Sequence, residues 1–434
     1  MVKLSKKLLI CTSLIILFSS IFLSVPSFSA DTLSPEISSP AVILIDYSTG
    51  KILYEKNMHE KRYPASLTKV MTAIIVLEKC ELDEIATVSN NAVSNIPPSY
   101  VTAFLQEGEQ FTVEQLLYLL LIPSANDAAV VLAEHVVGGT DNISEFFVLM
   151  NKRARDLGCK NTNFTNPSGI HDEAHYSTAY DLALIGQEAM KSETFRTIVS
   201  ATRYELPPTD LYENSRRFSN SNLLLNSNSD YYYRYSTGIK TGYTRPAGNC
   251  LIASASRNKL ELITVTLGSE QTENGLSERY LDTLNLFKYG YDAYAIKEIS
   301  KKGQVVQTIN VRGASYDTKR LDISLSEDVS VLIKKANLSD TILPNIVLHD
   351  KIKAPIQKDD ILGTITYSVE GITYTYDLIA SSNVEPSSTL RNILILVAIL
   401  LLLGSIRYVS ISKGKNPGTK KQTTKKKKKK YIQY

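Results

Sequence analysis

Residues 65–80 read ASLTKVMTAIIVLEKC. Apolar side chains surround almost the whole circumference of this stretch: Leu67, Val70, Met71, Ala73, Ile74, Ile75, Val76 and Leu77. Such a pattern predicts a helix that is buried in the core of a domain. Pro64 marks its start, so Ser66 lies in the first turn, and Lys69, three residues further on, shares its face.

Ser66 and Lys69 are the residue types of a nucleophile and its base. A serine hydroxyl attacks poorly near neutral pH unless a neighbouring group takes its proton. Burial, the positive end of the helix and a second cation at Lys240 would each disfavour the charged form of Lys69, and a base must be neutral. The alternative is a helix-start serine beside a solvated lysine, which fits poorly on a helix with so little polar surface.

Ser124-Ala125-Asn126 lies between two apolar stretches, residues 113–122 and 128–137. With Pro123 between them, these stretches predict two helices separated by a break. At such a break Ser124 could pass a proton to a leaving amine, and Asn126 could bind a substrate amide. An ordinary helix N-cap is the alternative, and it explains this tripeptide better when the tripeptide is taken alone.

Lys240-Thr241-Gly242 begins a series of strand-like runs that includes residues 250–255 and 260–267. A lysine and a threonine on an edge strand would suit a substrate carboxylate. Gly242 has no Cβ and would leave room for an extended peptide beside the strand. A solvent-facing Lys-Thr pair at a turn explains the tripeptide by itself equally well.

The order of these three motifs, together with residues 41–78, 161–183 and 238–252, resembles the D-alanyl-D-alanine carboxypeptidases. These are low-molecular-mass penicillin-binding proteins of the serine peptidase kind. The resemblance extends over residues 34–380. It implies an α/β fold, with a β-lactamase/transpeptidase-like catalytic domain followed by a small all-β sandwich domain.

The resemblance also implies a role for each motif residue. Ser66 would be the acylated nucleophile, Lys69 its base and Ser124 a further catalytic residue. The backbone N–H groups of Ser66 and Tyr243 would form the oxyanion hole. The substrate would be bound by Asn126, Lys240, Thr241 and Arg279. No metal or other cofactor is implied.

Two positions depart from the family pattern. Tyr243 stands where histidine is common, which matters little if only its backbone acts. Tyr180 stands where arginine is frequent, and the sequence does not show what that side chain contacts.

Residues 1–30 have the pattern of a secretory signal peptide, with three lysines, an apolar run over residues 8–25 and small residues before the cleavage site. An uncleaved membrane anchor is the alternative. The remaining cysteines, Cys80, Cys159 and Cys250, are odd in number and widely spaced, so they predict neither a disulfide framework nor a metal site. Buried thiols, or one disulfide and one free thiol, are both compatible with an exported protein.

Residues 390–406 are almost wholly apolar and predict a transmembrane helix about 25 Å long. The tail, residues 407–434, carries eleven positive charges and no acidic residue, which predicts that it stays in the cytoplasm. Residues 31–386 hold 33 Lys and Arg against 44 Asp and Glu, so the exported part is acidic. The tail therefore predicts contact with anionic lipid, or a disordered solubilising segment, and not a nucleic-acid arm.

We therefore expect a catalytic domain over residues 34–294 and a β-rich domain over residues 296–380. The expected protein is a single-pass bacterial membrane enzyme with its catalytic domain outside the cytoplasm. It would remove the terminal D-alanine from peptidoglycan stem peptides and be acylated by β-lactams. The alternatives are a serine β-lactamase and a non-catalytic protein that senses β-lactams or binds the wall.

Overall fold

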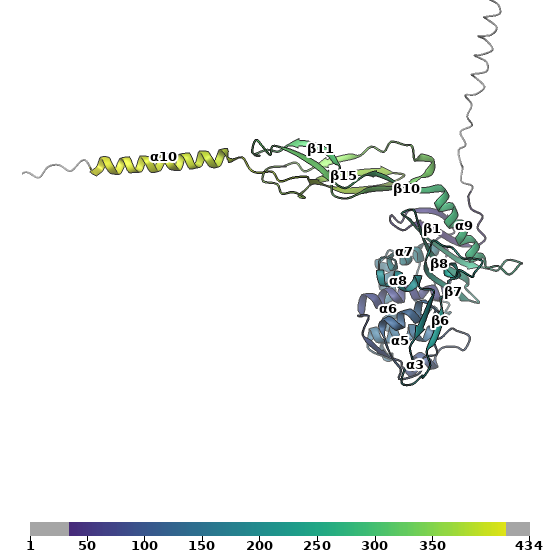
Figure 1. The fold of residues 1–434 in the computed structure, drawn as a ribbon. Helices are drawn as coiled ribbons and strands as arrows, with labels where there is room; N and C mark the ends of the chain where they lie inside the picture. Colours follow the sequence, from purple (N-terminus) through teal and green to yellow (C-terminus); the bar gives the residue numbers. More distant parts are fainter. Residues whose placement is uncertain (1–33, 414–434) are drawn as a thin grey trace, which may run out of the picture. The chain divides into compact units, whose positions relative to one another are not determined.

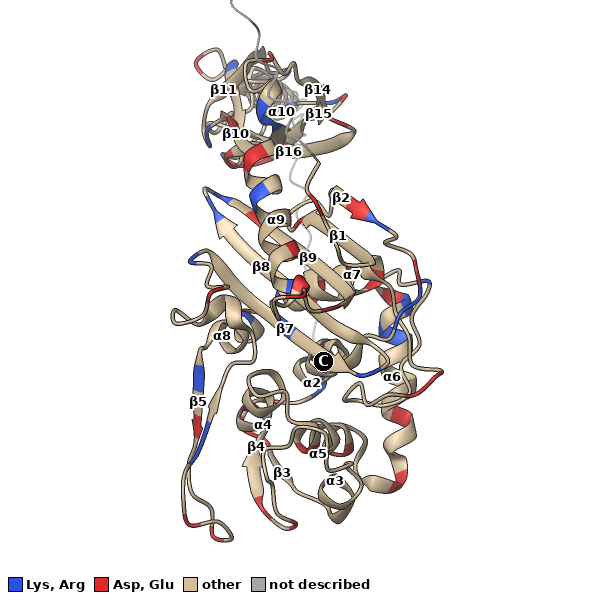
Figure 2. Cartoon of the chain, turned by 90° about the vertical axis from the view of Figure 1, so that its right-hand side faces the viewer, with Lys and Arg blue, Asp and Glu red and all other residues tan. Residues whose placement is uncertain are grey.

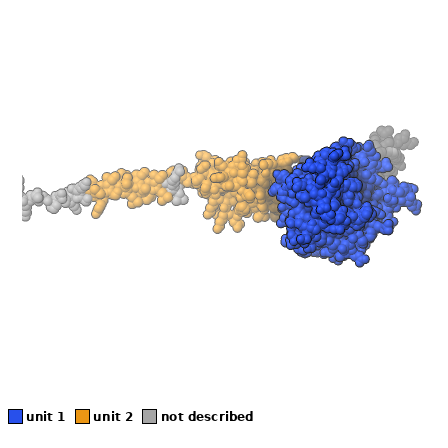
Figure 3. Space-filling model, turned by 90° about the horizontal axis from the view of Figure 1, so that it is seen from below, with its two compact units in different colours: residues 1–297, 330–342, 369–372 blue, residues 298–329, 343–368, 373–434 orange. Residues whose placement is uncertain are grey.

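The computed structural model describes residues 34–413. Within this range the chain forms two compact units, shown in different colours in Figure 3. One unit holds residues 34–297, 330–342 and 369–372. The other unit holds residues 298–329, 343–368 and the chain from residue 373 onward.

The first unit is built on a five-stranded antiparallel sheet with the strand order β2-β1-β9-β8-β7 (Figure 1). Its strands are β1 (Ala41–Asp46), β2 (Ile52–Lys56), β7 (Ser236–Thr244), β8 (Gly248–Arg257) and β9 (Leu260–Ser269). Because β7 pairs on one side only, the Lys240-Thr241-Gly242 motif lies on an edge strand, as the sequence predicted.

The sheet is buried on both faces. All six residues of β1 are buried, and neighbouring residues face different cores: Ile43 belongs to the core that includes helix α2, and Leu44 to the core that includes helix α9. Burial on both faces explains why β1 is apolar at nearly every position and does not alternate. The sheet thus lies between two cores, and its edge strand β7 carries the Lys240-Thr241-Gly242 motif.

The helical segments of the first unit that precede the second unit in the chain are mostly α-helices. They are η1 (Ala65–Thr68), α2 (Lys69–Lys79), α3 (Asn90–Ser94), α4 (Val113–Leu121), α5 (Asn126–Val137), η2 (Thr140–Asn142), α6 (Ile143–Asp156), α7 (Ala179–Ala189), α8 (Glu193–Ser200) and α9 (Glu278–Ala293). A further short turn is η3 (Leu223–Leu225), and two small hairpins pair β3 (Ile85–Thr87) with β4 (Gln110–Thr112) and β5 (Arg203–Leu206) with β6 (Arg216–Ser219).

The predicted helix over residues 65–80 is buried, but it does not start as an α-helix. Its first turn is the 3-10 turn η1, which begins with a residue of left-handed backbone, Ala65 (φ 49°). The N–H of Lys69 donates to the carbonyl of Ser66, an i to i−3 bond that tightens the turn. The prediction of a regular first helical turn was therefore wrong, although Ser66 and Lys69 still lie on one face.

The break predicted between two helices lies between α4 and α5. Ser124, within it, has left-handed backbone (φ 72°), a conformation that is strained for a non-glycine residue and frequent at functional sites. The N-cap of α5 is Ala125, with no side-chain cap. Neither Ser124 nor Asn126 is thus the capping residue that the alternative interpretation required.

The remaining strands form a β-rich region after α9. Five of them make a sheet with the order β11-β12-β16-β15-β14, and β10 pairs with β13. Their bounds are β10 (Tyr294–Ser300), β11 (Val305–Asn310), β12 (Arg320–Leu325), β13 (Val329–Lys334), β14 (Asn345–Leu348), β15 (Ile361–Val369) and β16 (Ile372–Ala380), with one 3-10 turn, η4 (Lys335–Asn337). The region is all-β apart from that turn, as expected.

Helix α10 (Ser388–Lys413) follows the β-rich region and is longer than the apolar stretch predicted over residues 390–406. Its segment Asn392–Ile411 is long and apolar enough to cross a membrane, with a mean hydropathy of 2.4. The predicted signal peptide, and the tail beyond residue 413, lie outside the described residues.

Candidate active site

Ser66 and Lys69 meet where η1 joins α2. The Lys69 Nζ lies 3.1 Å from the Ser66 Oγ. Lys69 is fully buried, whereas Ser66 is partly exposed. The buried lysine therefore contacts a hydroxyl that a substrate can still reach.

Lys69 has two further partners, both of them oxygen acceptors. Its Nζ donates to the Asn126 Oδ1 at 2.8 Å and to the Ser168 carbonyl at 2.7 Å. A neutral lysine amine has two hydrogens and one lone pair. If the two hydrogens go to these acceptors, the lone pair is left for the Ser66 hydroxyl, which is the arrangement a general base needs.

The surroundings of Lys69 favour the neutral amine. Burial, followed by the positive charge of Lys240, holds the pKa of Lys69 well below its usual range, and Asp127 opposes this shift. Burial and then Arg279 lower the pKa of Lys240 to about 7. A lysine with a depressed pKa in contact with a serine hydroxyl is a common sign of an activated nucleophile.

The turn of residues 166–169 supplies one of the Lys69 acceptors, and the motif analysis did not single it out. The Asn166 Oδ1 accepts the N–H groups of Ser168 and Gly169, and the Thr72 hydroxyl donates to the Pro167 carbonyl at 2.6 Å. The composition Asn-Pro-Ser-Gly signals a turn. Nothing in that composition, however, shows that its Ser168 carbonyl faces Lys69.

Asn126 links Lys69 to the chain before β4. Its Nδ2 donates to the Val101 carbonyl at 2.8 Å. The next residue, Asp127, is buried and accepts the backbone N–H groups of Ala103 and Leu105. Asp127 thus fixes the segment that orients Asn126, a role that the sequence analysis missed. An acidic residue within an otherwise apolar helix was the available signal.

β7 packs against η1, the turn that carries Ser66, and Figure 2 shows this strand at the edge of the sheet. A Cβ on Gly242 would lie 3.1 Å from the Ser66 backbone nitrogen, so this glycine allows the strand to approach the turn closely. Lys240 is buried, and the Thr241 hydroxyl is 2.7 Å from that of Ser221. Tyr243 is 61% exposed, which agrees with a role for its backbone and not its side chain.

Arg279, in α9, contacts the same strand. Its Nη1 donates to the Gly242 carbonyl at 3.1 Å. Its Nε is buried and has no hydrogen-bond partner among residues 34–413. A pocket of about 750 Å³ is lined by Arg62, Tyr243, Arg245 and Arg279, among others. The guanidinium groups make this end of β7 suitable for an anion.

The structure also shows what Tyr180 contacts. Its ring lies 5.0 Å, centroid to centroid, from the ring of His59, and its N–H donates to the Met58 carbonyl. Tyr180 therefore packs against the segment after β2 and does not hydrogen-bond to Lys69 or Lys240.

These groups define a class of protein. A serine beside a buried lysine whose pKa is lowered, a carboxamide hydrogen-bonded to that lysine, and an edge strand that carries a second lysine are the parts of a serine acyl-transfer site. Residues 28–271 match the family described as D-alanyl-D-alanine carboxypeptidase, and residues 294–386 match the C-terminal domain of penicillin-binding protein 5. The chain belongs to the D-alanyl-D-alanine carboxypeptidase family of serine peptidases.

Individual relatives agree with this assignment. The chain is 34% identical to the D-alanyl-D-alanine carboxypeptidase DacF of Bacillus subtilis, over 76% of this chain and 82% of the relative. It is 31% identical to DacA of Escherichia coli, over 78% and 81%. The crystal structure of penicillin-binding protein 5 from Haemophilus influenzae superposes with a TM-score of 0.62 at 28% identity, over 81% of this chain and 99% of that structure.

The comparisons confirm the resemblance and the fold class. The chain has an α/β catalytic domain of the carboxypeptidase family, then a β-rich domain, then one apolar helix. It is a serine carboxypeptidase, a hydrolase, of the penicillin-binding protein type.

The charge of Lys240 should set the pH at which acylation begins. Acylation by a labelled penicillin is expected to fail at low pH, as Lys69 takes up a proton below its folded-state pKa. Because the Lys240 cation lowers the pKa of Lys69, Lys240→Gln should move this acid limb to higher pH. Lys240→Arg retains the charge and should leave the limb near its wild-type position. Rate constants measured across pH would contradict this if Lys240→Gln left the limb unmoved.

Proposed function

We propose that this chain removes the terminal D-alanine from peptidoglycan stem peptides through an acyl-enzyme on Ser66. Ser66 Oγ attacks the carbonyl of the penultimate D-alanine while Lys69 takes the hydroxyl proton. The backbone N–H groups of Ser66 and Tyr243 stabilise the oxyanion, and Ser124 passes a proton to the departing D-alanine. Water then hydrolyses the ester and frees Ser66.

The substrate carboxylate lies, in this proposal, at the end of β7. Lys240, Thr241 and Arg279 hold it, and Asn126 binds a substrate amide. The support is the cationic edge strand beside the nucleophile, where the Arg279 Nε has no partner among the described residues. A β-lactam resembles the same peptide terminus, so it would enter the same site and acylate Ser66.

The observation that carries this proposal is the 3.1 Å contact between the Lys69 Nζ and the Ser66 Oγ, beside two oxygen acceptors that can take both hydrogens of a neutral amine. We expect the purified full-length protein to release D-alanine from a tripeptide ending in D-Ala-D-Ala. Peptide mapping after labelling should place a penicillin adduct at Ser66 alone, with Ser66→Ala as the unreactive control. An adduct at Ser124 or Ser256 would contradict the assignment.

A serine β-lactamase would require a base for rapid deacylation, usually a carboxylate. Asp127 is the acidic group nearest Asn126 in sequence, and both of its oxygens accept backbone N–H groups. It is therefore occupied in holding the chain and is a poor base for water. In the same assay, rapid turnover of penicillin without D-alanine release would favour a β-lactamase, and a stable adduct without D-alanine release would favour a silent binding protein.

We also propose that Asn392–Ile411 anchors the protein in the bacterial membrane as a single span. The catalytic domain, over residues 34–294, and the β-rich domain, over residues 296–380, would then lie outside the cytoplasm. Arg407 would lie near the cytoplasmic end of this span, and the lysine-rich tail that follows the span would stay inside, against anionic lipids. The support is one apolar helix followed by a lysine-rich tail.

This topology predicts a soluble, active truncation product. Ending the chain at about residue 388 should release a protein that still binds labelled penicillin, because Ser66 to Arg279 all precede that point. Protease added to intact cells should digest the full-length ectodomain and spare a tag placed after Tyr434. Digestion of the tag, or a truncated protein that stays in the membrane fraction, would instead favour residues 8–25 as an uncleaved anchor.

A further inference from the structure

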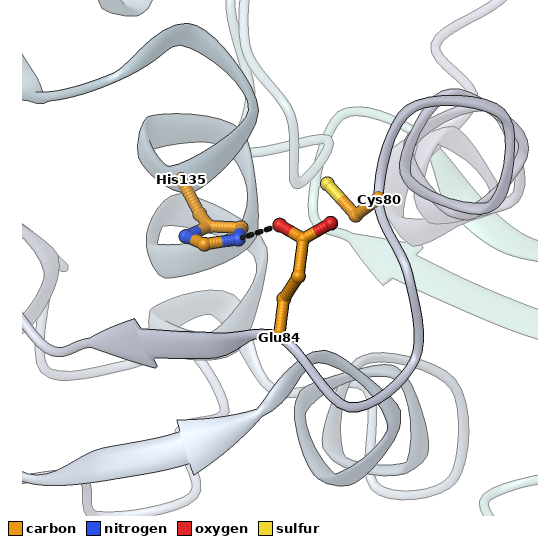
Figure 4. A group of neighbouring side chains, drawn as sticks. All are labelled: Cys80, Glu84 and His135. Atoms are coloured by element: carbon orange, nitrogen blue, oxygen red, sulfur yellow. Dashed lines mark hydrogen bonds and ion pairs between the residues drawn. The ribbon is translucent and has the colours of Figure 1, made fainter.

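Three metal-ligating side chains from different segments meet away from the candidate active site (Figure 4). Cys80 is the C-cap of α2, Glu84 immediately precedes β3, and His135 lies in the last turn of α5. One ligand atom from each, a sulfur, a carboxylate oxygen and an imidazole nitrogen, lies within 4.8 Å of the others. The fold, and not a local sequence motif, brings these three ligand types together.

Their chemistry selects a particular cation. A thiolate, an imidazole and one carboxylate suit Zn²⁺, with water as a fourth ligand, and suit Ca²⁺ or Mg²⁺ poorly. The Nε2 of His135 lies 2.9 Å from the Glu84 Oε2. Two such ligands around a tetrahedral Zn²⁺ would be about 3.3 Å apart, so the pair must open by only a few tenths of an ångström.

The charges at this place also favour a cation. Both α2 and α5 end here, and the C-terminus of a helix carries partial negative charge. Glu84 adds a carboxylate, whose second oxygen is held by the N–H of Glu81 at 2.7 Å. The side chains of His135 and Glu84 are 22% and 42% exposed, so an ion can enter from solvent.

We propose that Cys80, Glu84 and His135 form a structural zinc site on the catalytic domain. Zn²⁺ binding forms a bond to the Cys80 sulfur and releases the thiol proton to water. The sequence analysis predicted no metal site, because the three cysteines are odd in number and widely spaced. The proposed site uses only one of them, Cys80. Cys80, Cys159 and Cys250 are all free thiols in the structure, so the Cys80 sulfur is not committed to a disulfide.

The site would join the two helices that carry the active-site pair. Lys69 begins α2 and Asn126 begins α5, and these two side chains are hydrogen-bonded at the other ends of the helices. A cation bound between the C-terminal ends would fix α2 against α5 at both ends. The expected consequence is a higher melting temperature in the presence of zinc, without a direct part in acyl transfer.

The test uses the full-length protein in detergent with its thiols kept reduced. Titration with Zn²⁺ should show one tight site per chain, and Co²⁺ in its place should give a thiolate-to-metal charge-transfer absorption. Cys80→Ser should abolish that absorption. His135→Gln and Glu84→Gln should each weaken binding by at least about 10- to 100-fold, the loss that follows removal of even an outer-shell partner of a metal ligand. Zinc should raise the melting temperature of the wild type and not of Cys80→Ser.

Glu81→Gln is the matched control. It removes a neighbouring exposed carboxylate and keeps the backbone N–H that holds Glu84, so zinc affinity should be unchanged. Every variant should still be labelled by penicillin at the wild-type rate, which shows that it is folded. A wild-type protein without a stoichiometric zinc site, or Cys80→Ser with wild-type affinity and absorption, would overturn the proposal.

Discussion

Replacing Lys69 with alanine is expected to lower the rate of acylation, by peptide and by penicillin alike, about 10²- to 10⁴-fold, the range attributed to a general base. The structure gives the reason, because Lys69 Nζ is the side-chain nitrogen 3.1 Å from the Ser66 Oγ and is fully buried. Without it the serine must lose its proton to water. The measurement is the second-order rate constant for labelling by a fluorescent penicillin, alongside D-alanine release.

Two comparisons make the Lys69 result specific. Lys240→Ala removes the other buried lysine, which does not hydrogen-bond to Ser66, so it should slow acylation less and raise the substrate concentration needed. Thermal unfolding of Lys69→Ala should remain cooperative, because the substitution removes a buried amine and leaves an apolar helix intact. Wild-type acylation by folded Lys69→Ala would refute the assignment of Lys69 as base.

Gly169→Ala is expected to have an equally severe effect through geometry alone. An added Cβ at Gly169 would lie 1.9 Å from the Ala65 carbonyl oxygen, and the backbone there has φ +79°. The overlap is with backbone next to Ser66, so either the turn that presents the Ser168 carbonyl to Lys69 or the turn that presents Ser66 must move. We expect a loss of more than about 4 kcal/mol in the free energy of unfolding, or a folded protein acylated at least about 10²-fold more slowly.

Gly158→Ala is the matched control for this prediction. Gly158 also has left-handed backbone, with φ +87°, but a Cβ there would meet nothing within 4 Å. Gly158→Ala should therefore lower the free energy of unfolding only by the conformational penalty, about 1–2 kcal/mol, and should be acylated at the wild-type rate. Denaturant unfolding and penicillin labelling of both variants give the comparison. Equal unfolding free energies and equal labelling rates for the two variants would show that the close approach of Gly169 to Ala65 is unimportant.

Periodicity predicted the helices and strands that depend on burial. The apolar stretches over residues 113–122 and 128–137 correspond to α4 and α5, and the runs over residues 250–255 and 260–267 lie in β8 and β9. In each case the apolar side chains are the ones that the core buries. These predictions succeeded because burial of apolar surface is the main determinant of both the pattern and the fold.

The turns around the site were predicted less well. Residues 65–68 were expected to be α-helical and form a 3-10 turn that begins with a left-handed residue, Ala65. That conformation is stabilised by contacts with residues distant in sequence, such as Thr68 with His175 at 2.8 Å, which no local pattern records. The strained Ser124 was likewise predicted only as lying in a break.

The sequence by itself predicted the reactive groups, since it placed Ser66 and Lys69 on one helical face and Lys240 on a separate strand. Only the tertiary structure decided which backbone groups complete the site: the carbonyl of Ser168 on Lys69, that of Val101 on Asn126, and the approach of Gly242 to Ser66. It alone also brought Cys80, Glu84 and His135 together. Every residue has a backbone carbonyl, and every residue except proline has a backbone N–H, so the direction of these groups depends on the folded path of the chain and not on a local sequence pattern.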